Sequence, residues 1–114
     1  MLRLIIMAIM LLTTGEFADS PLTSTNFHTA YADLDIISKA SGTDGMLTTD
    51  LADYLVGPHK VDIKLAVVNA LGASINGRNN AQKLRNRLNR KYPGKNLQNA
   101  AAADELICLA YLKA

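Results

Sequence analysis

The sequence has few aromatic residues and almost no cysteine. Its 114 residues include no tryptophan, 2 phenylalanines, 4 tyrosines and 1 cysteine. With one cysteine the chain cannot form an internal disulfide, so no covalent cross-link can stabilise the fold. Hydrophobic residues nevertheless make up 49% of the sequence. Burial of aliphatic side chains must therefore supply the stability, and an aromatic cage is not expected.

The single cysteine, Cys108, stands between Ile107 and Leu109 in an apolar stretch near the end of the chain. We expect it to be a small buried hydrophobic residue. The alternative is a reactive or intermolecular thiol, but the sequence places no histidine or aspartate beside it to activate it.

Motifs that assemble catalytic or cofactor sites are absent from the sequence. It has no Gly-x-Ser-x-Gly elbow, phosphate-binding loop or dinucleotide fingerprint. His28 and His59 form no His-x-x-x-His pair, and Asp44-Gly45 with Asp50 matches only half of a calcium loop, so we expect a plain turn there. We therefore predict no catalytic residue, no cofactor and no metal site. A hydrolytic enzyme whose groups meet only in space stays open as an alternative.

A short apolar run opens the chain. Residues 4–12 are all apolar and follow Arg3. As a helix this run would span about 14 Å at roughly 1.5 Å per residue, whereas the hydrocarbon layer of a membrane is about 30 Å thick. We expect no stable transmembrane anchor. We interpret residues 1–18 as a cleaved bacterial signal peptide of an exported, periplasmic or secreted protein, with cleavage after Gly15 or after Ala18.

The remainder, residues 19–114, suits a single α-helical domain. Five of its segments have the three- and four-residue apolar spacing of helices. They are residues 25–41, residues 49–56, residues 59–71, a segment from Asn79 or Asn80 to Tyr92, and residues 96–113. Five short helices and no strand predict an all-α bundle with orthogonal or hairpin-stacked helices.

Capping residues predict where the first two helices begin or end, and polarity predicts which helices are buried. We expect Thr48 or Thr49 to cap the second helix and Gly42 to end the first in a left-handed conformation. The third helix should be central, because residues 59–71 have little polar surface. The last segment, residues 96–113, contains four successive alanines and then a nearly continuous apolar run. It should form one helix that is buried against several neighbours.

The segment Val61-Asp62-Ile63-Lys64-Leu65-Ala66-Val67-Val68-Asn69-Ala70-Leu71-Gly72 resembles the second helix of a HEAT-type repeat. The preceding segment, Thr49 to Val56, is similar to the first helix of such a pair, so the resemblance covers residues 49–72. It implies a helix pair in the middle of the chain and a protein-binding role. The apolar leader followed by Ser20-Pro21-Leu22-Thr23-Ser24 also resembles a group of small exported bacterial helical proteins, which implies no activity.

Charge is distributed unevenly along the chain. Most carboxylates precede residue 63, whereas eight Lys and Arg lie between Asp62 and Asp104 with no acidic residue among them. Such a division can indicate an anionic partner, or it can mean that the two halves of the domain complement each other. The candidate anion-binding residues form a basic ridge: Arg78, Lys83, Arg87, Arg90, Lys91 and Lys95. The alternative is a solvated or internally neutralised face.

These observations predict a non-enzymatic exported protein that binds another macromolecule, in the first instance another protein. The alternative is an anion-binding module that uses the basic ridge, residues 78–95, on a lipid headgroup, a cell-wall polymer or a nucleic acid. No aromatic residue alternates with the cations to stack bases, which does not favour nucleic acid.

Overall fold

The computed structural model describes residues 25–72 and 74–113. The expected signal peptide, residues 1–18, lies outside these residues. The described chain forms six α-helices, two 3₁₀ helices and no strand, which confirms the all-α class. The elements are η2 (Phe27–Tyr31), α3 (Asp35–Ser41), α4 (Thr49–Leu55), α5 (Val61–Leu71), η3 (Ile75–Gly77), α6 (Asn80–Lys91), α7 (Leu97–Ala100) and α8 (Ala103–Lys113).

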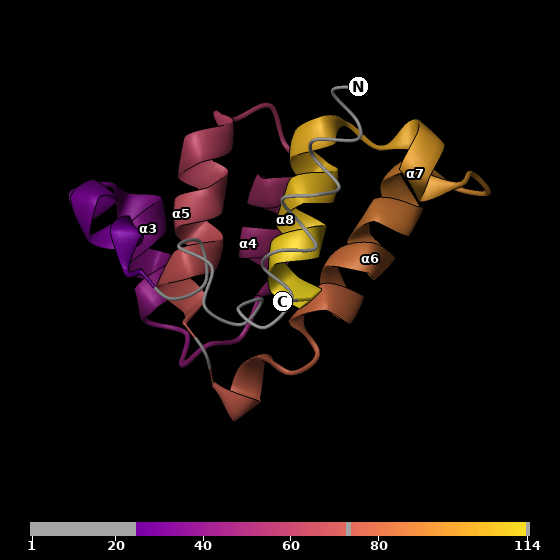
Figure 1. The fold of residues 1–114 in the computed structure, drawn as a ribbon. Helices are drawn as coiled ribbons and strands as arrows, with labels where there is room; N and C mark the ends of the chain where they lie inside the picture. The colour runs from indigo at the N-terminus through magenta and orange to yellow at the C-terminus, as the bar shows by residue number, and fades with distance from the viewer. Residues whose placement is uncertain (1–24, 73, 114) are drawn as a thin grey trace, which may run out of the picture.

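Helix α5 occupies the centre of the bundle, as predicted. It contacts η2, α3, α4 and α8. Figure 1 shows α5, α8 and α6 side by side, with α3 on the outer side of α5 and α4 behind α5 and α8. Ala66 and Val67 in α5 are completely buried. The segment contains many β-branched residues, which favour strands, but it forms a core helix. A helix directs its apolar side chains to several neighbouring elements at once.

The core is aliphatic, as the composition predicts. Its buried hydrophobic residues come from five helices and from the residues just before and after α4: Ile37, Ala40, Leu47, Leu51, Ala52, Leu55, Val56, Ala66, Val67, Val68, Leu71, Leu84, Leu88, Cys108 and Leu109. Each fully buried leucine contributes about 2 kcal/mol of transfer free energy. Cys108 is completely buried, and burial raises the pKa of its thiol to about 11. This burial confirms Cys108 as a core residue.

The first predicted helix, residues 25–41, is wrong as a single helix. The chain forms η2, becomes extended at Leu34 (φ −88°, ψ 134°) and then forms α3. A continuous helix would be about 26 Å long, whereas α5 with its 11 residues is about 17 Å long at roughly 1.5 Å per residue. The break allows η2 and α3 both to pack on α5.

We expected Gly42 to end the first helix in a left-handed conformation. Its φ is −90°, so this expectation is wrong. The chain reverses two residues later, where Asp44 (φ 56°) and Gly45 (φ 89°) are both left-handed. Thr48 then caps α4, and its side chain accepts a hydrogen bond from the N–H of Leu51 at 3.3 Å. The predicted turn, at residues 42–45, and the predicted helix cap are confirmed, but the left-handed residues are Asp44 and Gly45 and not Gly42.

The last predicted helix, residues 96–113, is also interrupted. Helix α7 ends at Ala100, Ala101 is extended (ψ 150°) and α8 begins at Ala103. Four successive alanines would favour a continuous helix, so a tertiary interaction must override their propensity. Nor is α8 covered on all sides, since Ile107 is 44% exposed. The apolar face that packs inward contacts α5 and α6.

The interaction at this break is made by Glu105, which is 2% exposed. Its carboxylate accepts hydrogen bonds from the backbone N–H of Ala102 at 2.8 Å, from Tyr92 Oη at 2.8 Å and from Lys91 Nζ at 2.5 Å. The bond to Ala102 is that of a glutamate in the first turn of a helix to the residue before it, and it begins α8 at this position. Lys91 Nζ also donates to the carbonyl of Val56 at 2.7 Å. The ends of α4 and α6 thus meet the beginning of α8.

A second ion pair with one buried partner also joins α8 to the bundle. Lys64 in α5 is 1% exposed, and its Nζ lies 2.6 Å from Oδ2 of Asp104 in α8. The hydrogen bond from Lys64 lowers the pKa of Asp104 against the opposing effect of burial. Burial raises the pKa of Glu105, but the hydrogen bonds from Lys91, Ala102 and Tyr92 outweigh it, so this pKa is also lowered. Both carboxylates are therefore held in the charged form.

Replacing Glu105 with alanine should destabilise the fold by about 2–3 kcal/mol, because it leaves a lysine, a tyrosine and a backbone N–H without their shared acceptor. Urea unfolding followed by circular dichroism measures the change. Asp50→Ala is the control, since the Asp50 side chain is 76% exposed and its loss should cost under about 1 kcal/mol. Equal unfolding midpoints for Glu105→Ala and the unmodified chain would contradict the role of Glu105.

Stability should fall on acidification. Asp104 and Glu105 have pKa values below their ordinary 3.8 and 4.5, so the unfolded chain binds protons at a higher pH than the folded chain does. Their contribution is complete above about pH 5 and is lost as the pH falls through the folded pKa values. The urea midpoint should be level from pH 7 to about pH 5 and then decrease. Glu105→Gln should make the decrease shallower, and a midpoint that rises toward pH 3 would refute this account.

Candidate functional site

Helices α4 and α6 are aligned by one buried amide at their beginnings. Asn80 is 3% exposed, and its side chain accepts from the N–H of Leu47 and donates to the carbonyl of Gly45, each at 2.8 Å. Asn79 is the cap residue of α6, without a side-chain cap bond. A Cβ on Gly77 would lie 2.7 Å from the Gly45 carbonyl oxygen, so this close approach requires glycine.

Two more polar contacts join the same two segments farther along. Arg87 Nε lies 2.6 Å from Oδ1 of Asp53, and Lys91 Nζ donates to the carbonyl of Val56. All these contacts occur in the same order along the two helical segments, so α4 and α6 run parallel. One face of α6 is thereby held beside the beginning of α4.

The surface between these two helices forms a pocket of about 510 Å³, which we call the basic pocket. Its lining residues are Leu47, Thr48, Thr49, Ala52, Lys83, Asn86, Arg87 and Arg90. The residues from α6 are spaced by three and four positions and therefore lie on one helical face. Three of the predicted anion-binding residues, Lys83, Arg87 and Arg90, thus meet in one pocket, next to two threonine hydroxyls.

The cations of the basic pocket are only partly neutralised. Within the part of the chain that the structure describes, no carboxylate lies within ion-pair distance of Lys83 or Arg90. Arg87 pairs with Asp53, whose side chain is 51% exposed. Such a partly exposed pair contributes under about 1 kcal/mol to stability. The pocket therefore presents an excess of positive charge to solvent.

The other three ridge residues lie elsewhere. Lys91 is engaged by Glu105 and by the Val56 carbonyl. Lys95 follows the turn after α6 and is exposed. Arg78 lies at the edge of a different pocket. The predicted ridge is thus divided: Lys83, Arg87 and Arg90 share a site, and Arg78, Lys91 and Lys95 do not belong to it.

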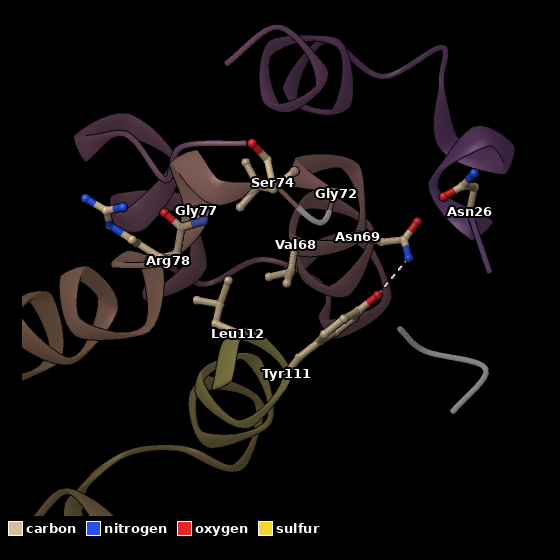
Figure 2. Close-up of a pocket in the computed structure, with 11 residues that line it drawn as sticks. Asn26, Val68, Asn69, Gly72, Ser74, Gly77, Arg78, Tyr111 and Leu112 are labelled. Carbon is tan, nitrogen blue, oxygen red and sulfur yellow. Dashed lines mark hydrogen bonds between the residues drawn. The ribbon is translucent and has the colours of Figure 1, made fainter. Parts of the chain in front are cut away.

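That different pocket, of about 390 Å³, lies between the C-terminal parts of α5 and α8 (Figure 2). Val68 and Leu112 form apolar parts of its lining, and the Asn69 side-chain nitrogen lies 2.7 Å from Tyr111 Oη. Asn69 also accepts from the backbone N–H of His28 at 3.0 Å. These bonds fasten η2 to α5 and α8, which gives the polar residues here a structural role.

The histidines and acids noted in the sequence do not come together. In residues 25–72 and 74–113 no group of three His, Cys, Asp or Glu side chains is placed to hold a metal ion. His28 Nδ1 lies 2.7 Å from Oδ1 of Asn69, and the ring of His59 stacks on Tyr54 with centroids 3.8 Å apart. Both histidines thus have structural contacts.

Sequence reasoning missed several members of the basic pocket. Asn86 could have been found, since it lies on the same helical face as Lys83 and Arg90. The two threonines could not, and neither could Asp53, which is not part of the lining but pairs with Arg87, because their positions depend on how α4 is aligned with α6.

None of the helices of the described chain has the length and apolarity that a membrane span needs. In comparisons with known proteins, no family model, curated protein or solved structure matches the chain.

Proposed function

We propose that this chain is a non-enzymatic binding protein that holds an acidic segment of another protein in the basic pocket. The observation that supports this function best is the convergence of Lys83, Arg87 and Arg90 on one pocket, two of them without an acidic partner in the described chain. Positive charge held in a concave surface attracts anionic groups and accelerates their association.

A protein segment fits this pocket better than an extended polyanion does. The cations Lys83 and Arg90 line one pocket of about 510 Å³ on one face of α6, which suits a single short acidic segment. The neighbouring Asp50 and Asp53 are exposed, and they would repel a continuous anionic surface such as a membrane or a nucleic acid. The resemblance of residues 49–72 to a HEAT-type pair, in a family that binds proteins, agrees with this choice.

The test is a titration of the full chain with a fluorescent hexaglutamate peptide, monitored by anisotropy. Binding should weaken as salt is added, because the contacts are exposed charge pairs. The double variant Lys83→Glu/Arg90→Glu should lower affinity at least about tenfold. Lys95→Glu reverses a ridge charge outside the pocket and is the matched control, which should bind like the unmodified chain.

Two further probes separate the alternatives. Vesicles containing phosphatidylglycerol and a single-stranded oligonucleotide test the lipid and nucleic-acid interpretations of residues 78–95. Stronger binding of either probe than of the peptide, with an equal loss in the Lys95→Glu variant, would favour an extended polyanion and contradict the proposed partner. Absence of binding to all three probes would refute the basic pocket as a binding surface.

We further propose that the protein acts outside the cytoplasm after cleavage of a signal peptide within residues 1–18, either after Gly15 or after Ala18. The apolar run of residues 4–12 behind Arg3 supports this proposal. The intact mass of the protein isolated from its native host should correspond to a chain that begins at Glu16 or Asp19. A mass that retains Met1 to Ala18 would contradict export by cleavage.

A further inference from the structure

The contact between Asp53 and Arg87 leaves most of the guanidinium unused. Asp53 Oδ1 takes only the Nε donor of Arg87, at 2.6 Å. A guanidinium has five N–H donors arranged in a rigid fork, and its terminal nitrogens have no partner among the described residues. The Arg87 side chain is 25% exposed and lines the basic pocket. A half-buried arginine is thus anchored on one edge and open at its end.

This arrangement is suited to a carboxylate. With Nε occupied, an incoming ligand can reach the two terminal nitrogens end-on, and two parallel N–H···O bonds match the spacing of carboxylate oxygens. The Thr48 hydroxyl oxygen accepts a hydrogen bond from the N–H of Leu51, so its own O–H is available as a donor. Lys83 and Arg90 add charge without fixed geometry.

We propose that Arg87 is the residue of the basic pocket that recognises a carboxylate of the bound acidic segment, and that Asp53 is a positioning residue that holds the Arg87 fork toward this ligand. The proposal rests on the proposed function and specifies its chemistry. The ligand group is one aspartate, glutamate or C-terminal carboxylate bound by both terminal nitrogens of Arg87. Lys83 and Arg90 provide long-range attraction, whereas Arg87 fixes the orientation of the bound carboxylate.

Removal of Asp53 should change the affinity for an anion in opposite directions, depending on whether Asp53 positions Arg87 or only neutralises its charge. If Asp53 only neutralised Arg87, its removal would remove a negative charge from beside the pocket and strengthen anion binding. If it positions Arg87, loss of the acceptor frees the side chain to sample other rotamers, and binding weakens because the fork must be ordered again. An asparagine keeps an acceptor oxygen for Nε–H and removes only the charge.

The experiment compares Asp53→Ala, Asp53→Asn and Arg87→Lys with the unmodified chain, using the hexaglutamate peptide at several salt concentrations. Asp53→Ala should weaken binding about fivefold, and Asp53→Asn should bind at least as tightly as the unmodified chain. Arg87→Lys keeps the charge, so affinity should fall about tenfold while the dependence on salt stays the same. Tighter binding by Asp53→Ala, or unchanged binding by Arg87→Lys, would overturn the proposal.

Two measurements make the outcome specific. The urea midpoint of each variant should stay near that of the unmodified chain, because the Asp53 side chain is 51% exposed and its ion pair adds little stability.

A hexaserine peptide with one phosphoserine tests the ligand group, and tighter binding of this peptide than of hexaglutamate would overturn the carboxylate assignment. If hexaglutamate binds but ignores all three substitutions, the role of Arg87 fails while the proposed function stands. If it does not bind at all, both fail.

Discussion

The buried carboxylate of Glu105 joins the helices α4, α6 and α8 at one point. The arrangement of these three helices depends on this interaction. It bonds the end of α6 through Lys91 and Tyr92 and begins α8 through the N–H of Ala102. Lys91 extends the contact to the end of α4 through the Val56 carbonyl. Because Asn80 fastens the beginnings of α4 and α6 as well, the two helices are fixed at both ends and run parallel. The basic pocket lies between these fixed ends.

The uneven charge of the sequence has two consequences in the fold. Part of it is neutralised internally, since Asp53 meets Arg87 and Asp104 meets Lys64 across the bundle. Part of it is left over, in Lys83 and Arg90 on the open face of α6. Complementary halves account for the Asp53–Arg87 pair, and the proposal of an anionic partner rests on the cations that are left over. In that proposal Asp53 positions Arg87, and Lys83 and Arg90 provide attraction.

Local sequence patterns predicted the helical class, the central place of residues 59–71 and a cap at Thr48 or Thr49, because these depend on spacing and on nearby side chains. They failed where distant residues decide. The alanines before Asp104 favour a continuous helix, and the break there involves Glu105, which is held by Lys91 and Tyr92 at the end of α6. Likewise, spacing placed Lys83, Arg87 and Arg90 on one face, but not Asp53, whose contact with Arg87 spans 34 positions. Such contacts arise from the packing of helices and have no local signature.

In the proposed function, the parallel pair α4 and α6 forms the working surface of this protein. The most direct measurement is the change in the two-dimensional amide NMR spectrum of the chain as an acidic peptide is added. If acidic peptides bind between α4 and α6, the amide signals of Thr48 and Thr49 should shift together with those of α6 from Lys83 to Arg90. Shifts confined to α5 and α8, or to Arg78 and Lys95 without the basic pocket, would contradict it.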